Sequence, residues 1–354
     1  MIHIDGSYGE GGGQIVRSSL SLSLVTGKPF TIAGVRARRR KPGLQQQHLA
    51  AVRAAARVGN AEVRGAELGS TRFSFQPQSV RPGDYTFRIG TAGSTMLVLE
   101  TLLPALIWEN GPSAVCLEGG THNPFAPPYD FIANTYLPVL QRMGSRVTPR
   151  LERYGFYPVG GGRVAVSVDG TPLMRGIRLL ERGDFADGRV RAVVANLPEH
   201  IARRECDALA RLSGWAEDCF QVEQVTQAHG PGNVVLIELH FAEMTETIAA
   251  FGRKGVPAEE VAREAWLEAE AFMASDAPVG THLADQLMLP MAIAASHGCS
   301  SAYRTLPLSE HSRTHLAVID QFLDVQTSVE QDGSECVVTI SPRDEGRHTG
   351  PSAA

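Results

Sequence analysis

The stretch MIHIDGSYGEGGGQIVRSSLSLSLV, residues 1–25, sets the pattern on which the fold prediction rests. A short strand-like run leads into a glycine-rich turn, and an apolar run with helical spacing follows it. The same order returns in YTFRIGTAGSTMLVLETLLPALIW, residues 85–108, and a third copy is suggested over residues 114–144. This alternation predicts an α/β (α+β) fold, made of repeated β/α units whose helices pack on sheets.

The character of the sequence changes near residue 183. A strand-like run, GRVRAVVANL at residues 188–197, is followed by a helical run, further strands and an acidic helix that ends near residue 275. The earlier style then returns. We therefore predict a small α/β domain over residues 183–276, inserted into a discontinuous repeat domain of residues 1–182 and 277–354.

The composition is typical of a globular protein, with 43% hydrophobic and 20% charged residues and no apolar stretch long enough to span a bilayer. We expect no membrane association and a cytoplasmic location. The five cysteines match neither a metal knuckle nor a disulfide framework, so free thiols are expected. Because the net charge is −5, any contact with nucleic acid would depend on the basic cluster at residues 36–41.

The turn at residues 9–13 reads Gly-Glu-Gly-Gly-Gly. Backbone N–H groups of such a turn, at the start of a helix, can bind a phosphate. The turn lacks the Gly-Lys-Ser/Thr ending of a Walker A loop, and Gln14 stands where a dinucleotide-binding loop has its last glycine. A carboxylate beside phosphates, here Glu10, is typical of a bridging divalent metal. The alternatives are a tight turn without a ligand and an acid exposed to solvent.

Two arginines are candidates for binding phosphate oxygens. Arg17 is expected on the first turn of the helix that follows the glycine turn, and Arg39 lies in the basic cluster. Gln47 and His48 are expected on the next helix and could add polar contacts. Guanidinium groups bind phosphate oxygens in a bidentate manner, which favours this function. The alternatives are a solvated basic face and a plain helix surface.

His311 and His315 are four residues apart and would share one face of a helix over LSEHSRTHLAVIDQFL, residues 308–323. The spacing fits a metal pair, but neither an H-E-x-x-H motif nor a cysteine ligand set accompanies it. Structural or surface histidines are the alternative. Upstream, Gly280 and Asp285 fit the start of another helix, with the acid near the positive end of its dipole.

Several segments together resemble the RNA 3'-terminal phosphate cyclase family. RYGFYPVGGG at residues 153–162 matches the family's signature segment, and the resemblance runs from Met1 to about Pro342. Other matching segments are DGSYGEGGGQIVRSSLSLS (5–23), RRRKPGLQQQHLAAVRAA (38–55), IGTAGSTMLVLETLLPAL (89–106), ADQL (284–287) and H-x-x-T-x-x-A-V (311–318).

The resemblance implies β/α units of the type shared with enolpyruvyl transferases, interrupted by a small α/β domain. It also implies a reaction with ATP in which a histidine takes up AMP and passes it to RNA 3'-phosphate ends, which then close to 2',3'-cyclic phosphates. The family's nucleophile aligns with His311, and Glu10 with a residue that faces a divalent ion, Mg²⁺ or Mn²⁺. The implied nucleotide- and phosphate-binding residues are Arg17, Arg39, Gln47, Glu100, His282, Leu283, Ala284, Asp285 and Gln286.

Two positions depart from the family pattern. His282 stands where a tyrosine often stacks on adenine, and Glu100 stands where a glutamine often contacts the nucleotide. Two other functions compete with the cyclase assignment. A catalytically silent relative that acts in ribosome assembly would lack the histidine nucleophile, whereas His311 is present. An enolpyruvyl transferase would need close segment matches that this sequence lacks. The oligomeric state does not follow from the sequence.

Overall fold

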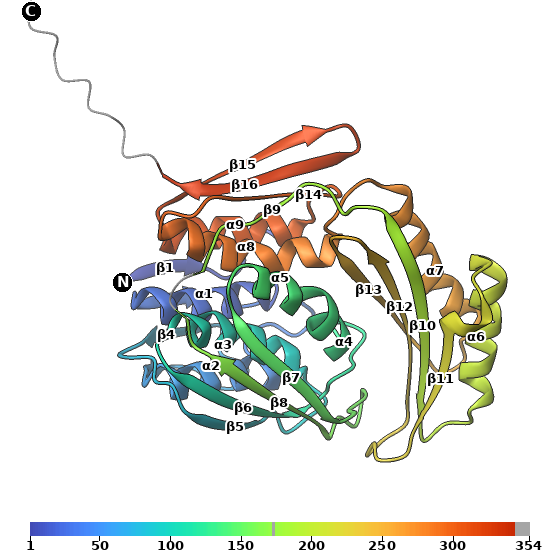
Figure 1. Cartoon of the computed structure of the whole chain (residues 1–354). Coiled ribbons are helices and arrows are strands. Elements are labelled where there is room, and N and C mark those ends of the chain that lie inside the picture. The colour runs from blue at the N-terminus through green and yellow to red at the C-terminus, as the bar shows by residue number, and fades with distance from the viewer. Residues whose placement is uncertain (172–173, 344–354) are drawn as a thin grey trace, which may run out of the picture.

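The computed structural model describes residues 1–171 and 174–343, which form four sheets of four strands each (Figure 1). Three sheets belong to units with one order of elements, two β/α steps followed by a hairpin. In each unit the first two strands are parallel, and the remaining pairs are antiparallel. The spatial order is first, second, fourth, third. The predicted fold of repeated β/α units is thereby confirmed.

The first unit contains the glycine turn of residues 9–13. Its helix α1 packs against helices of all three units, α2, α3 and α9, and it ends at Gly27, whose φ of 69° suits a left-handed helix cap. The elements of this unit are β1 (Ile2–Asp5), α1 (Gln14–Thr26), β2 (Phe30–Ala33), α2 (Gln46–Val58), β3 (Glu62–Arg64) and β4 (Arg72–Gln76).

The second unit supplies the most apolar helix, α3, which is buried on nearly every side because it lies in the middle of the core. The elements are β5 (Asp84–Arg88), α3 (Thr95–Trp108), β6 (Pro112–Gly119), α4 (Tyr129–Phe131), the π-helical η1 (Ile132–Tyr136), α5 (Leu137–Arg142), β7 (Arg146–Arg153) and β8 (Gly162–Asp169). The third copy of the sequence pattern, residues 114–144, belongs to this unit, since β6 pairs with β5.

The third unit is split in the sequence. Its elements are β9 (Arg178–Leu179), α8 (Thr281–Ser296), β14 (Ser301–Thr305), α9 (Glu310–Phe322), β15 (Val325–Asp332) and β16 (Glu335–Pro342). Residues 344–354, which the sequence assigns to the repeat domain, lie outside the described residues. Within the described ranges, no helix combines the length and the apolar composition needed to cross a bilayer.

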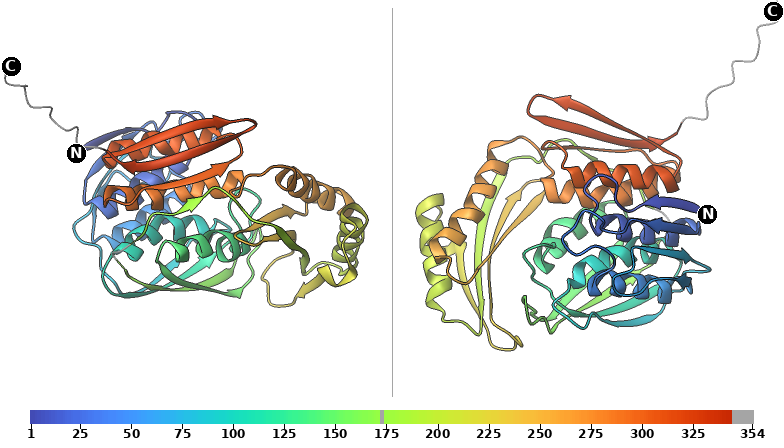
Figure 2. Two further views of the ribbon diagram at one scale, coloured as in Figure 1. Left: turned by 45° about the horizontal axis from the view of Figure 1, so that its top comes forward. Right: turned by 180° about the vertical axis from the view of Figure 1, so that it is seen from behind.

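A fourth sheet is inserted between β9 and α8, in the spatial order β11-β10-β12-β13. Helices α6 and α7 pack on each other and cover its outer face, while η1 of the second unit contacts β13 (Figures 1 and 2). The boundaries at residues 183 and 276 stay a prediction. The inserted elements are β10 (Phe185–Ala195), α6 (His200–Ser213), η2 (Glu217–Cys219), β11 (Phe220–Val225), β12 (Gly232–Phe241), β13 (Thr245–Phe251) and α7 (Ala258–Ala274).

Arg182 joins the two ends of this insertion. Its guanidinium donates hydrogen bonds to the carbonyl oxygens of Phe272 at 2.8 Å and Met273 at 2.9 Å, and to that of Ser275. The same group lies 4.3 Å from the centre of the Phe241 ring. The Arg182 side chain therefore connects the segment that enters the insertion, after β9, with the segment that leaves it, before α8.

We expect Arg182→Ala to lower the free energy of unfolding by about 3 kcal/mol, because charged hydrogen bonds are lost and the carbonyl groups of Met273 and Ser275 lose this donor. Arg182→Lys should recover only part of this, since an ammonium cannot bind three carbonyls in one fork. Arg178→Ala, an exposed arginine on β9, is the control. Thermal unfolding of the three variants measures the effect, and equal melting temperatures for Arg182→Ala and Arg178→Ala would contradict it.

Candidate active site

The turn before α1 and the start of α9 meet, although they lie at opposite ends of the chain. The backbone N–H of Glu10 donates to Thr314 Oγ1 at 3.4 Å. Gly9 has a φ of 54°, and a Cβ on it would collide with the Thr314 side chain. Glycine at this position therefore permits the close approach of the turn to α9.

His311 lies on the first turn of α9, after the helix cap Ser309, and its side chain is half exposed. Its Nδ1 is 2.5 Å from Glu10 Oε2 and 3.1 Å from Gln14 Oε1. Both oxygens act as hydrogen-bond acceptors, so Nδ1 carries the proton. The other ring nitrogen, Nε2, then keeps its lone pair.

Burial lowers the pKa of His311 below its ordinary value of 6.5. Asp285 acts in the opposite direction and raises the pKa of His311, while the cations Arg17 and Arg39 lower it. The net direction is downward, so the imidazole is neutral at pH 7. A neutral imidazole with a free Nε2 is a competent nucleophile.

Glu10 lies between His311 and Arg39. It forms an ion pair with Arg39, and the Glu10 side chain is 21% exposed. In the described part of the chain, no three or more His, Cys, Asp or Glu residues cluster as a metal site. A divalent ion at Glu10 would therefore take its remaining ligands from phosphate oxygens and water. This is the usual coordination of Mg²⁺ beside a nucleotide, so the single carboxylate fits such an ion.

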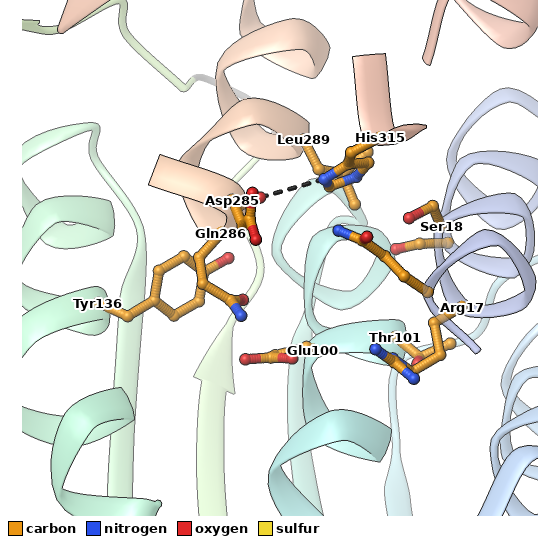
Figure 3. A pocket seen from close by; sticks show the side chains of 11 residues that line it. Arg17, Ser18, Glu100, Thr101, Tyr136, Asp285, Gln286, Leu289 and His315 are labelled. Carbon is orange, nitrogen blue, oxygen red and sulfur yellow. Dashed lines mark hydrogen bonds between the residues drawn. The ribbon is translucent and has the colours of Figure 1, made fainter. Parts of the chain in front are cut away.

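A polar pocket of about 60 Å³ lies among α1, α3, η1, α8 and α9 (Figure 3). Gln14, which contacts His311, also lines it. The volume holds only a few water-sized groups, so it is too small to enclose a whole nucleotide. The lining residues are Gln14, Arg17, Ser18, Ser21, Glu100, Thr101, Tyr136, Asp285, Gln286, Leu289 and His315.

Glu100 is the one ionisable residue in α3 and points into this pocket (Figure 3). Its Oε1 is buried without a hydrogen-bond partner in the described structure. Burial raises the pKa of Glu100 to about 8, although Arg17 lowers it. The carboxyl is thus protonated at neutral pH, and it then offers one donor and one acceptor, as a glutamine amide does. The departure at position 100 is therefore chemically small below about pH 8.

Asp285 ties α8 to α9. Its Oδ1 accepts hydrogen bonds from Ser309 Oγ at 3.3 Å and from Ser312 Oγ, and its backbone carbonyl accepts one from His315 Nδ1 at 3.1 Å. The Nε2 of His315 is buried without a partner among the described atoms. Burial lowers the pKa of His315 to about 4, so this nitrogen is an acceptor on the pocket wall.

Sequence reasoning did not assign His315 or Gln14 to this site. The four-residue spacing from His311 did signal a shared helix face, but it could not show that the face points into a pocket. The sequence marks Gln14 only as the residue that stands where a dinucleotide-binding loop has its last glycine, and its contact with His311 spans 297 positions. No local pattern signals such a contact.

The remaining predicted residues are dispersed. Gln286 lines the pocket, whereas Leu283 and Ala284 are buried in the main core, so only their backbone could reach a nucleotide. His282 is 73% exposed and lies 3.6 Å from Glu268. Its imidazole is thus free to contact a base only at the rim.

Gln47 and Arg39 lie outside the pocket. A Cβ on Gly93 would be 3.3 Å from Gln47 Cβ, so Gln47 lies against the loop before α3. His48 lies against Gly13, and burial lowers the pKa of His48 to about 3. Of the predicted residues, the structure brings Arg17, Glu100, Asp285 and Gln286 into one pocket and places Glu10, Arg39 and His311 beside it.

A family model described as RNA 3'-terminal phosphate cyclase matches residues 8–329. A relative named RNA 3'-terminal phosphate cyclase from Koribacter versatilis (strain Ellin345) is 46% identical over 97% of this chain and 96% of its own. One of the same name from Salmonella typhimurium is 45% identical over 96% of this chain and 99% of its own. Among solved structures, the enolpyruvyl transferase NikO from Streptomyces tendae has 17% identity and a TM-score of 0.27, covering 48% of this chain and 33% of that chain.

Glu100→Gln should change how stability depends on pH. Between about pH 4.5 and 8 the unfolded chain ionises Glu100 while the folded protein keeps it protonated, so wild-type stability falls as the pH rises. The loss is up to about 1.4 kcal/mol per pH unit, and glutamine does not incur it. Melting temperatures should be measured for both proteins from pH 5 to 8. The melting temperature of Glu100→Gln minus that of the wild type should increase as the pH rises. Parallel curves would contradict the buried, protonated state.

Proposed function

The chain belongs to the RNA 3'-terminal phosphate cyclase family, and we propose that it uses ATP to convert RNA 3'-phosphate ends into 2',3'-cyclic phosphates through a covalent adenylate on His311. The observation that carries this proposal is the imidazole of His311, whose Nδ1 is bonded to Glu10 and Gln14. That arrangement favours attack by Nε2. The proposal includes a cytoplasmic location, as expected from the sequence.

In the first proposed step, Nε2 of His311 attacks the α-phosphorus of ATP. A P–N bond forms, the bond to the bridging oxygen breaks, and pyrophosphate leaves with that oxygen. The ring becomes cationic in this step, and the carboxylate of Glu10 beside Nδ1 stabilises the developing charge. The contact with Gln14 orients the ring at the same time.

In the second proposed step, an oxygen of the RNA 3'-phosphate attacks the phosphorus of the adenylate, and Nε2 of His311 leaves as a neutral imidazole. In the third, the 2'-oxygen attacks the 3'-phosphorus, a proton is released, and AMP departs. The intermediate adenylate is needed because a phosphate monoester has no good leaving group, whereas AMP leaves readily.

Charge on the transferring phosphates would be offset by Arg17, Arg39 and a divalent ion, Mg²⁺ or Mn²⁺, held by Glu10. Such an ion, when bound, polarises the phosphoryl oxygens. We assign Gln47 to the same phosphate-facing group because it follows the basic cluster and lies against Gly93.

The adenylate would lie against the start of α8, with its edge in the pocket that Glu100, Asp285 and Gln286 line. His282 at the rim would stack over a smaller area than a tyrosine does. Leu283 and Ala284 would contribute backbone contacts.

Incubation with α-labelled ATP and Mg²⁺ or Mn²⁺ should label the protein through an acid-labile, base-stable bond, as expected for phosphorus on imidazole. His311→Ala should abolish the label. His200→Ala, an exposed histidine at the start of α6, is the matched control and should keep it. Mapping of the labelled peptide locates the adduct. A wild-type protein that stays unlabelled with both metals would instead favour the non-catalytic binding factor.

The rate of labelling should depend on pH in one direction only. Since burial holds the pKa of His311 below 6.5, the neutral nucleophile is already present at pH 6.5, and the initial rate should level off above it. The rate should fall as the pH drops below that range, because Nε2 becomes protonated. Initial rates at saturating ATP from pH 5 to 8 measure this, and a rate that still climbs tenfold between pH 7 and 8 would contradict it.

A further inference from the structure

Two exposed aromatic rings lie on loops that neither the fold nor the proposed reaction explains. Phe125 is 95% exposed and Tyr157 is 66% exposed. Single apolar side chains on a surface are common and need no explanation. The position of these two rings relative to the candidate active site gives them significance.

The segments that carry the two rings are joined by hydrogen bonds. The backbone N–H groups of Thr121 and His122 both donate to the carbonyl oxygen of Gly155, at 2.8 Å and 3.1 Å. His122 also forms a parallel bridge with Phe156. The loop with Phe125 and the loop with Tyr157 therefore both begin at these two hydrogen-bonded segments, residues 121–122 and 155–156.

Both loops border the turn at residues 90–94, which precedes α3. Asn123 donates from Nδ2 to the carbonyl oxygen of Ala92 at 2.7 Å, and a Cβ on Gly160 would lie 2.8 Å from Ala92 Cα. The next residue, Gly93, lies against Gln47, since their Cβ positions would be 3.3 Å apart. The turn at residues 90–94 thus contacts Gln47, which we propose faces phosphate, on one side and the two loops on the other.

We propose that Phe125 and Tyr157 form a platform on which the RNA bases immediately upstream of the 3' end stack. The inference rests on the proposed function, because it takes the 3'-phosphate to lie near His311 and Gln47. From that point the strand has to continue outward over the surface. The rings stand two residues from Asn123 and three from Gly160, beside the turn that Gln47 contacts.

The chemistry of this surface fits a single strand of RNA. Sites for single strands combine cations that follow the backbone with aromatic rings that stack on bases. The cations lie in the basic cluster before α2, where Arg40 and Lys41 are exposed and, within residues 1–171 and 174–343, have no acidic partner within 4.0 Å. Stacking tolerates any base, so the platform would accept ends of any sequence.

The backbone around Phe125 suits such a platform. Pro124, Pro127 and Pro128 flank the ring and restrict the loop before any ligand binds. A loop whose backbone is restricted in advance loses less entropy on binding.

The test uses the full chain and a 3'-phosphorylated pentaribonucleotide with 2-aminopurine next to the terminal nucleotide. The wild-type protein should quench the fluorescence. Phe125→Leu and Tyr157→Leu keep apolar volume but remove the rings, so each should weaken quenching and raise the KM for RNA about tenfold. Phe125→Tyr and Tyr157→Phe keep a ring and should behave as wild type. Leu212→Ala, an exposed apolar residue on α6, is the surface control.

Adenylylation of His311 by ATP is the second measurement, and all these variants should retain it, because neither ring is part of that step. If the wild type is labelled and cyclises RNA, but both leucine variants keep its KM and quenching, the platform is overturned while the proposed function stands. The exposed rings would then belong to a protein contact. If the wild type is never labelled but quenches through the rings, the platform is supported and the proposed reaction is overturned.

Discussion

The contact of the His311 imidazole with Glu10 and Gln14 is the interaction on which the candidate site depends. Gln14 and His311 are 297 positions apart, so this contact exists only when the first and third units pack through α1 and α9. The collision that a side chain on Gly9 would cause with Thr314 shows how tight the packing is. One contact thus fixes the tautomer of the proposed nucleophile, His311, and the position of Glu10 beside it. Chemical competence follows from the packing of helices, and the local motif around His311 is not sufficient for it.

Behind this contact, ionisable side chains are buried in the wall of the pocket. Glu100 is the clearest case, because α3 contains no other ionisable residue and is buried on nearly every side. In such surroundings burial decides the protonation of each group: it keeps Glu100 protonated and His315 neutral at pH 7. Unpartnered atoms of both residues face the same small pocket. Polar atoms left in this way reduce stability, which is typical of a site that gains its partners from a ligand.

The sequence predicted the repeated β/α units, because strand and helix periods alternate clearly around the glycine turns. It also predicted that His311 and His315 share one face of a helix within residues 308–323, and the structure has α9 there. The resemblance of H-x-x-T-x-x-A-V to one family singled out His311 of the two. The pairing of strands was harder to predict. Residues 114–144 repeat the pattern of residues 85–108, yet β5 and β6 share one sheet, since periodicity reports local faces and does not report neighbours in space.

Because the insertion lies between β9 and α8, it delays the pairing of β9 with its neighbouring strand β14 during synthesis. Ile177, just before β9, donates its N–H to the side chain of Ser301, which lies 124 positions later in the chain. At ribosomal rates β9 waits on the order of ten seconds for its partner strand. During that interval Glu10, Arg17 and Arg39 have already been synthesised, but His311 has not yet been added to the chain. A nascent chain that has not reached residue 311 therefore carries the proposed phosphate-facing residues without the proposed nucleophile, so it could not yet modify itself with AMP by the proposed route.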